Sequence, residues 1–455
     1  MHGRAYVERY ALIVSVCVGV GVFYRKDAKT QSFRSGFFRY SELDIACPSA
    51  GGDIRRSKSF FPMKKLIVIS IVALTLVASC HKKESQAESS ADTTTFHLDW
   101  DAMSTTLMQR MNLEAGEKVL IVANPGRFDE MIPLLREKIL AARGEYLGTI
   151  SVDTINWPQS WRTDFVNGTK NMSVDAMADY MKDADIAIMM PGADVSHTPY
   201  QAMQKVLQRG SGRTIHFHWS GAYSLDGAAL PLTENVDKVY EDALLNTNYN
   251  SISVLHQFFE ESARRSVIRV TTPVGTDITF SIGDRPVTKQ NGDASKVRTA
   301  HARNLIDREI ELPAGAIRVA PIEETVNGVI AFPDAQWNGK DVTGLKLTIK
   351  AGKIVAIKAS SGLEDVKEEL RMAGPAGEWF REFALGFNPL LAIPQNGPRW
   401  IPYYGYGAGV VRLSLGDNTE LGGKVKGGYV RWNFFTDATV SIGERNIVVD
   451  GKMLQ

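Results

Sequence analysis

Residues 118–142 read KVLIVANPGRFDEMIPLLREKILAA and combine a strand, a turn and a helix in immediate succession. The first six residues are almost entirely apolar, which is typical of a strand that is buried on both faces. An Asn-Pro-Gly turn follows. The apolar residues after that turn recur at helical spacing, at Phe128, Ile132, Leu135 and Ile139. The stretch therefore predicts one strand–helix unit of a layered α/β domain.

The same alternation continues toward the C-terminus as far as about residue 265. Further strands are predicted at 186–190 and 214–219, and further helices at 200–207 and 253–265. For the last of these helices we expect Leu255, Phe258 and Phe259 to form the buried face. Apolar strands that alternate with helices favour an open, largely parallel α/β sheet over residues 99–265.

From about residue 266 the pattern changes to short alternating strands, most of them separated by Gly, Asp or Asn turns. These strands are predicted at 267–271, 278–282, 317–320, 329–332, 345–349 and 353–359. The clearest helix of this part is 363–372. Short strands joined by tight turns are typical of antiparallel sheets, so residues 266–455 predict an α+β, mainly antiparallel domain.

The 455 residues include 52 Lys+Arg and 51 Asp+Glu, and 44% of them are apolar. This balance excludes a disordered chain, a collagen-like chain and a strongly basic nucleic-acid binder, so we expect no nucleic-acid partner. The cysteines are Cys17, Cys47 and Cys80. Three are too few for a disulfide-dense scaffold or a cysteine-rich zinc module.

Residues 63–80 read MKKLIVISIVALTLVASC and resemble a bacterial lipoprotein signal. Two lysines precede an apolar stretch that is shorter than the roughly 20 residues a spanning helix needs, and small residues then lead to Cys80. A buried hydrophobic helix is the alternative. The lipoprotein interpretation makes 1–62 an over-long gene model, 63–79 the signal peptide, and 80–98 a polar tether that starts at the lipidated Cys80.

A lipidated N-terminus implies a location in the bacterial cell envelope. We expect the lipid to anchor the chain to a membrane, in the outer membrane with the domain facing the periplasm or the surface.

Three motifs could carry chemistry without reference to any family. The turn Asn124–Arg127 could hold an anion at a helix start, but it lacks the G-x-G-x-x-G spacing, and an ordinary turn is the favoured alternative. His216 and His218 project to one face of a predicted strand, where they could share a metal or form a polar strand end. The aromatic run 400–406 could expose rings to a ligand or dimer partner, or pack in the core.

The chain after the tether resembles the aminopeptidase T-like metallopeptidases over most of its length. The matching segments, in order, are LEAGEKVLIV at 113–122, GTDITF at 275–280, LPAG at 312–315, APIEE at 320–324, NGV at 327–329, EFALGFNP at 382–389 and VDG at 449–451. Each segment alone is a weak signal, and their order and spacing make the resemblance specific.

The resemblance implies two divalent metals that activate water to remove N-terminal residues from peptides. The family's carboxylate, imidazole and Tyr ligands correspond here to Ala316, Glu382, Arg412, about Thr419, Arg431 and Asn433. Only Glu382 keeps the family's ligand. An arginine stays protonated at any biological pH and offers only donors, so Arg412 and Arg431 cannot hold a metal.

We therefore predict no metal or other cofactor, and a ligand-binding site made of Glu382, Arg412, Arg431 and Asn433. The implied function is a lipid-anchored, non-catalytic family member that binds a peptide or small acidic ligand, because arginine pairs bidentately with carboxylates. The arginines could instead simply form a salt bridge with Glu382. Two other functions stay open: an active aminopeptidase with two divalent metals on other ligands, and a structural envelope protein. By resemblance we also expect a homodimer through the second domain.

Overall fold

The structure is a computed structural model that describes residues 96–153 and 157–454, all of which belong to one compact unit of the chain. The predicted gene-model extension at 1–62, the signal peptide at 63–79 and the lipidated Cys80 lie outside the described residues. Within the described part, no helix combines the length and the apolar character that crossing a membrane requires.

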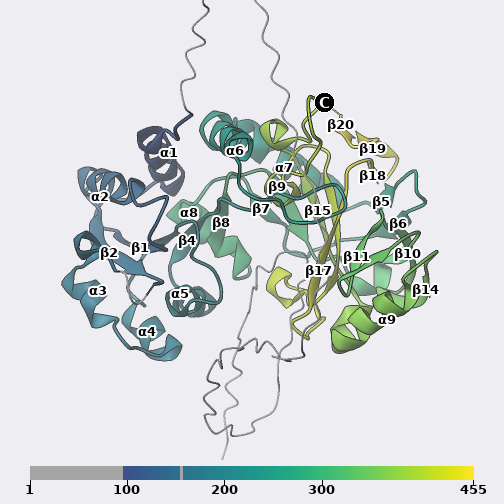
Figure 1. Ribbon diagram of the computed structural model, residues 1–455, viewed down its shortest axis with the longest axis horizontal. Helices are drawn as coiled ribbons and strands as arrows, with labels where there is room; N and C mark the ends of the chain where they lie inside the picture. Colours follow the sequence, from purple (N-terminus) through teal and green to yellow (C-terminus); the bar gives the residue numbers. More distant parts are fainter. Residues whose placement is uncertain (1–95, 154–156, 455) are drawn as a thin grey trace, which may run out of the picture. The chain divides into compact units, whose positions relative to one another are not determined.

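Five parallel strands form the first sheet, in the order β2-β1-β3-β4-β8 (Figure 1). The strands are β1 (Lys118–Ala123), β2 (Glu145–Ser151), β3 (Ile186–Met189), β4 (Arg213–Phe217) and β8 (Glu309–Leu312). All neighbouring strands run parallel, which confirms the predicted α/β fold. β3 and β4 are buried throughout, as expected for strands covered on both faces. β8 lies beyond residue 265, and the predicted domain boundary there stays a prediction.

Helices flank this sheet and continue into the C-terminal part (Figure 1). Their bounds are α1 (Trp100–Met111), α2 (Met131–Ala141), α3 (Asp164–Gly168), α4 (Val174–Tyr180), α5 (Thr198–Gln208), α6 (Glu234–Asn246), α7 (Tyr249–Ala263), α8 (Lys296–Thr299) and α9 (Leu363–Met372). Side chains cap several of them. Asp99 accepts from the Ala102 N–H at the start of α1, and Thr233 accepts from the Val236 N–H at the start of α6.

The buried face of α7 differs from the prediction. Its buried residues are Ile252, His256, Phe259 and Ala263, which form one stripe at helical spacing. Phe259 is buried as expected. Leu255 and Phe258 are 37% and 40% exposed, so their predicted burial is wrong. Each precedes a buried residue by one position, and neighbouring positions on a helix point about 100° apart.

In the described residues, the C-terminal part contains antiparallel sheets, which confirms the predicted mainly antiparallel α+β fold (Figure 1). One sheet has the order β14-β13-β10-β6-β5-β18-β19-β20, a second has the order β17-β16-β15-β9-β7, and β11 pairs with β12. The bounds are β5 (Ile268–Thr271), β6 (Asp277–Phe280), β7 (Thr288–Gln290), β9 (Ala316–Val319), β10 (Asn327–Ala331), β11 (Ala335–Trp337), β12 (Lys340–Val342), β13 (Lys346–Lys350), β14 (Lys353–Lys358), β15 (Phe380–Gly386), β16 (Val411–Gly416), β17 (Val430–Phe435), β18 (Thr439–Ile442), β19 (Arg445–Val449) and β20 (Lys452–Met453).

The sheet that contains β15 has one apolar face and one charged face. Phe383 and Leu385 belong to the core that this sheet shares with the eight-stranded sheet. The Phe383 ring lies 5.3 Å from the ring of Phe280 on β6, centroid to centroid. Because alternate residues of a strand point to opposite faces, Glu382 and Ala384 lie on the other face, which holds the candidate site.

Candidate functional site

Three adjacent strands place charged side chains on the second face of this sheet. Ala384 of β15 lies opposite Arg318 of β9 and Arg412 of β16, and Glu382 lies opposite Ser414. Residues that pair directly across strands project to the same face, so all five line one surface.

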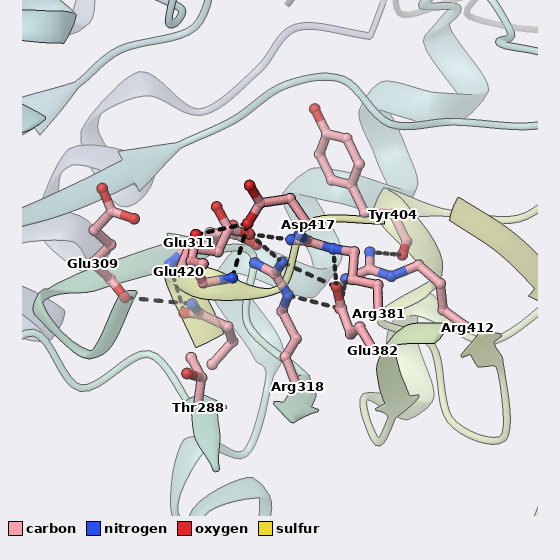
Figure 2. A network of polar contacts seen from close by, with 12 residues as sticks. Thr288, Glu309, Glu311, Arg318, Arg381, Glu382, Tyr404, Arg412, Asp417 and Glu420 are labelled. Atoms are coloured by element: carbon pink, nitrogen blue, oxygen red, sulfur yellow. Dashed lines mark hydrogen bonds and ion pairs between the residues drawn. The ribbon is translucent and has the colours of Figure 1, made fainter. Parts of the chain in front are cut away.

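Glu382 is fully buried at the centre of three guanidinium groups (Figure 2). Arg412 Nη2 donates to Oε1 at 2.6 Å. Arg318 donates through Nε to Oε1 at 2.9 Å and through Nη2 to Oε2 at 3.3 Å. Arg381 Nε donates to Oε2 at 3.2 Å. Arg381 contacts the same carboxylate as its neighbours because the strand register shifts between Phe380 and Glu382, and such an irregularity re-aims side chains.

A second carboxylate, Glu420, contacts these arginines from the solvent-facing side. It lies on the short 3-10 turn Thr419–Leu421 that follows β16. Its Oε1 accepts from Arg318 Nη2 at 3.1 Å and also from Arg381 Nη2. The side chain of Glu420 is 30% exposed, whereas those of Arg318 and Arg381 are 6% and 2% exposed. We use the term arginine cluster for five residues: Arg318, Arg381, Arg412, Glu382 and Glu420.

The arginine cluster keeps its central carboxylate ionised. Burial raises the pKa of Glu382, but the guanidinium groups of Arg318, Arg412 and Arg381 outweigh burial and hold the pKa well below its ordinary value. The pKa of Arg318 lies above its ordinary value, because the charges of Glu382 and Glu420 outweigh the effect of burial. Both partners are therefore fully charged in the neutral pH range.

Aromatic rings border the arginine cluster on the side of Arg412. The Arg412 guanidinium carbon lies 4.6 Å from the ring centroid of Trp432, a cation–π arrangement. Arg412 Nη1 also donates to the backbone oxygen of Tyr404 at 3.2 Å. The Tyr404 ring meets Trp432 edge-on at 5.8 Å between centroids. Trp432 is 37% exposed, so this edge of the arginine cluster reaches solvent.

A second polar group lies on β4 and β8, on the opposite side of the network from Arg412 in this view (Figure 2). His216 Nε2 lies 3.4 Å from Glu309 Oε1, and Gln204 donates to the same oxygen. Burial raises the pKa of Glu309 to about 8. Burial lowers the pKa of His216 well below its ordinary value, and the charge of His218 lowers it further. This group therefore holds a neutral carboxyl and a neutral imidazole near pH 7.

The predicted site residues divide between the two faces of the sheet. Glu382 and Arg412 are ion-paired, as the salt-bridge alternative expected. Arg431 instead donates to Glu369 Oε1 at 2.8 Å, and its guanidinium carbon lies 3.6 Å from the ring centroid of Trp337. Asn433 accepts from Arg431 Nε at 3.1 Å. Ligand binding at these residues stays a prediction, but they do not meet in one place.

The division follows from the register of β17. Leu413 pairs with Asn433 and Leu415 with Arg431, so both predicted residues share the face of the apolar leucines. Trp432 lies opposite Ser414 and therefore shares the face of Glu382. A one-residue change in register moves every side chain of a strand to the other face, so the correspondence of Arg431 and Asn433 to the family's His-x-Asp pair stays a prediction. Phe434, paired with Arg412, also lies on the site face.

Sequence reasoning also missed Arg318, Arg381 and Glu420. Strand alternation could have found Arg318, because it lies two residues after Ala316 on a strand and so shares its face. Arg381 is next to Glu382 in the sequence, but its contribution depends on the irregularity in β15, which leaves no sequence signal.

The side chains present do not fit the pair of divalent metals that the family resemblance implies. Besides Glu382, the site face carries Ala316, Arg412, Trp432 and Phe434, none of which supplies a carboxylate or a neutral imidazole. Glu382 directs both of its oxygens to arginines. In the part of the chain that the structure describes, no three His, Cys, Asp or Glu side chains are grouped as a metal ion requires.

The aromatic run of residues 400–406 has mainly the core-packing role. Trp400, Tyr403 and Tyr406 are 5%, 0% and 1% exposed. Tyr404 is only partly buried, and the Tyr406 hydroxyl donates to Glu311. The run therefore contacts both the parallel sheet and the arginine cluster. Of its rings, Tyr404 is the one beside Trp432, at the solvent-facing edge of the arginine cluster.

Comparison with known proteins supports the resemblance noted above. The fold is similar to that of 2,5-dihydroxypyridine dioxygenase from Pseudomonas putida KT2440, with a TM-score of 0.53, 15% identity, and coverage of 78% of this chain and 96% of that one. It is also similar to AmpT from Thermus thermophilus, with a TM-score of 0.51, 15% identity, and coverage of 78% and 99%. No curated protein matches. Residues 255–393 match the model of the thermophilic metalloprotease (M29) family.

Proposed function

We propose that this chain is a lipid-anchored, non-catalytic member of the M29 fold that binds a peptide or small acidic ligand at the arginine cluster. The observation that carries the proposal is the set of guanidinium groups around Glu382, the one family ligand that this sequence retains.

The arginine cluster opposes metal binding for two physical reasons. Guanidinium groups have no lone pair to give, and their fixed positive charge repels a divalent cation. The only carboxylate at the family's positions, Glu382, is already bound by Arg318, Arg381 and Arg412. A metal would have to displace these partners and leave their charges buried without compensation, which is strongly unfavourable.

The same groups suit an acidic ligand. Arginine presents a planar set of donors that matches a carboxylate. The arginine cluster also has an open edge, because Trp432 and Glu420 are partly exposed beside the buried arginines. Trp432 and Tyr404 there offer ring surface to an apolar part of a peptide.

The membrane anchor rests on the sequence alone. Residues 63–80 support a lipoprotein signal, and we propose attachment through Cys80 in the bacterial cell envelope. Metabolic labelling with a fatty acid tests this. The label should follow the full-length chain and disappear in Cys80→Ser, and a label that persists in that variant contradicts the anchor. The homodimer through the second domain is likewise a proposal, which light scattering of the purified chain tests.

The decisive experiment titrates the purified protein with Zn²⁺ or Co²⁺, assays a leucyl anilide, and measures binding of an acidic peptide by calorimetry. We expect no stoichiometric metal, no turnover, and peptide binding that Arg412→Ala weakens about tenfold. The matched control is Arg269→Ala, because Arg269 forms an exposed ion pair with Asp277 on another sheet. Turnover with bound metal would reject the proposal. Equal weakening by both variants would assign the effect to net charge and remove Arg412 from the site.

A further inference from the structure

We infer that Glu420 occupies a carboxylate-binding site formed by Arg318 and Arg381, and that an incoming ligand carboxylate takes its place. This inference rests on the proposed function and names the contact through which an acidic ligand enters.

Exposure separates Glu420 from the rest of the arginine cluster. Its side chain is 30% exposed, whereas Glu382 is 0% exposed and Arg318 is 6% exposed. A ligand that arrives from solvent therefore meets Glu420 first. Glu382, enclosed on all sides by guanidinium groups, is not available for exchange.

The bonding pattern also marks Glu420 as the replaceable carboxylate. Both arginine contacts of Glu420 converge on one oxygen, Oε1. Glu382, by contrast, accepts through both oxygens and from an additional arginine, Arg412. A carboxylate held through one oxygen at a partly exposed position is released at lower cost than one held through two in the interior.

Charge balance explains why the position must be filled. Without Glu420, the arginine cluster would hold the positive charges of Arg318, Arg381 and Arg412 against the single negative charge of Glu382. Uncompensated buried charge is costly, so a second carboxylate is needed whether or not a ligand is present. Replacing Glu420 by a ligand carboxylate exchanges one anion for another and keeps this balance.

The turn that carries Glu420 is anchored, so the exchange needs only a side-chain rotation. Asp417 Oδ1 accepts from the Thr419 N–H at 2.9 Å, and its Oδ2 accepts from the Gly427 N–H at 2.8 Å. On the other side of Glu420, Leu421 is 1% exposed and packs in a small apolar cluster. With the backbone held on both sides, the Glu420 side chain can turn toward solvent without a loop movement.

The geometry points to a ligand that brings one accessible carboxylate, such as the free C-terminus of a short peptide or a small organic acid. The two sources share the chemistry that Arg318 and Arg381 recognise. They differ in what lies behind the carboxylate, because a peptide can also contact Trp432 and Tyr404.

The test compares Glu420→Ala with the parent chain in calorimetric titrations with succinate, N-acetyl-alanyl-alanine and the corresponding peptide amide. The control is Glu324→Ala, which removes an exposed carboxylate that pairs with Lys424 at 3.3 Å. We expect Glu420→Ala to bind the peptide acid at least tenfold more tightly than the parent, and Glu324→Ala to stay within twofold. The amide should gain nothing. Succinate that gains as much as the peptide acid identifies a small organic acid as sufficient.

Equal affinity of the parent chain and Glu420→Ala for the acids would overturn the inference, as would equal gains for acid and amide, or no binding to either protein. If Glu420→Ala does not fold, Glu420→Gln preserves the side-chain volume and is held to the same thresholds. Acid binding that needs Arg412 but ignores Glu420 would reject the exchange and leave the proposed function standing. Metal-dependent turnover would reject the proposed function itself.

Discussion

The molecule contains two buried groups of arginine and glutamate that differ in their charge balance. In the parallel sheet, Arg213 holds Glu117 bidentately at 2.7 and 2.8 Å, and Arg213 Nε donates to the Ala294 oxygen. One guanidinium meets one carboxylate, and both are almost fully buried. In the antiparallel sheet, Glu382 has several guanidinium partners. The partly exposed Glu420 supplies a second negative charge to the same cluster.

The difference separates a structural ion pair from a candidate site. The Arg213–Glu117 pair matches one positive charge with one negative charge, so it has no electrostatic reason to accept a ligand. The arginine cluster differs, because its charge balance depends on a carboxylate at its solvent-facing edge, Glu420. The lesson is that the number of charges of each sign, more than burial itself, distinguishes a binding site from a structural contact.

The largest expected effect is on stability, and it tests this charge comparison directly. Glu382→Gln should lower the free energy of unfolding by roughly 5 kcal/mol, because it leaves several buried guanidinium groups without a full counter-charge. Glu117→Gln should lower the free energy of unfolding by roughly 3 kcal/mol, because it leaves only Arg213 without a counter-charge. Urea denaturation at pH 7 measures both. If Glu117→Gln costs as much or more, the charge comparison fails.

A second prediction uses a buried carboxylate that has a neutral hydrogen-bond partner. The folded-state pKa of Glu309 is about 8, above the ordinary value of 4.5, so the folded chain binds this proton more tightly. Its contribution to stability is full below pH 4.5 and is lost as pH rises to about 8, by at most about 5 kcal/mol. Glu309→Gln should remove this decline in denaturation curves between pH 5 and 9. A parent chain whose stability is level over that range would contradict the assignment.

Glu382 should show the opposite pH dependence to Glu309. Its folded-state pKa lies well below 4.5, so its stabilising effect is present above that value and is lost as pH falls through the lower one. Acid denaturation of the parent chain should therefore begin at a lower pH than expected for an unpaired glutamate. In Glu382→Gln this component should be absent, which thermal melts between pH 2 and 5 would show.

A smaller effect separates the two faces of the sheet. Arg412→Ala should weaken acidic-peptide binding about tenfold, or about 1.4 kcal/mol, whereas Arg431→Ala should change it less than twofold. Arg431 lies on the face of Glu369 and Trp337, so its loss should appear mainly in stability. Equal losses of binding for the two variants would mean that both faces contribute to one site.

The smallest effect is an expected lack of change. The double variant Arg431→His with Asn433→Asp restores the family's His-x-Asp pair at the positions suggested by the ungapped comparison. It should not gain Zn²⁺ binding in calorimetry, because these side chains point away from Glu382. A stoichiometric gain of zinc would show that β17 has the other register in solution.

The layered folds were largely predictable because their signal is local. Apolar runs such as 118–123 and 186–190 identified two strands of the parallel sheet. The place of β8 was not predicted. The alternation of Glu309 and Glu311 with apolar residues is typical of a half-buried antiparallel strand, and nothing in 309–312 shows that it joins a parallel sheet formed far earlier in the chain.

The candidate site was predictable only in part. Glu382 and Arg412 were found by resemblance, and their contact is observed. The face of the sheet on which Arg431 lies depends on strand register. A sequence comparison without gaps does not fix that register to within one residue. The role of Glu420 depends on a turn that brings it back to the sheet, so no local sequence pattern indicates it.

The arginine cluster has a consequence for the surroundings in which the protein would work. Imidazole ligands take up protons in mildly acidic media and release their metal, so a histidine-based centre changes its charge there. Guanidinium groups do not titrate in that range, and Glu382 stays ionised far into acid. The cell-envelope location that we propose would expose the protein to the acidity of its surroundings. Its central charges would then stay constant through environmental swings that disable a metal-dependent relative.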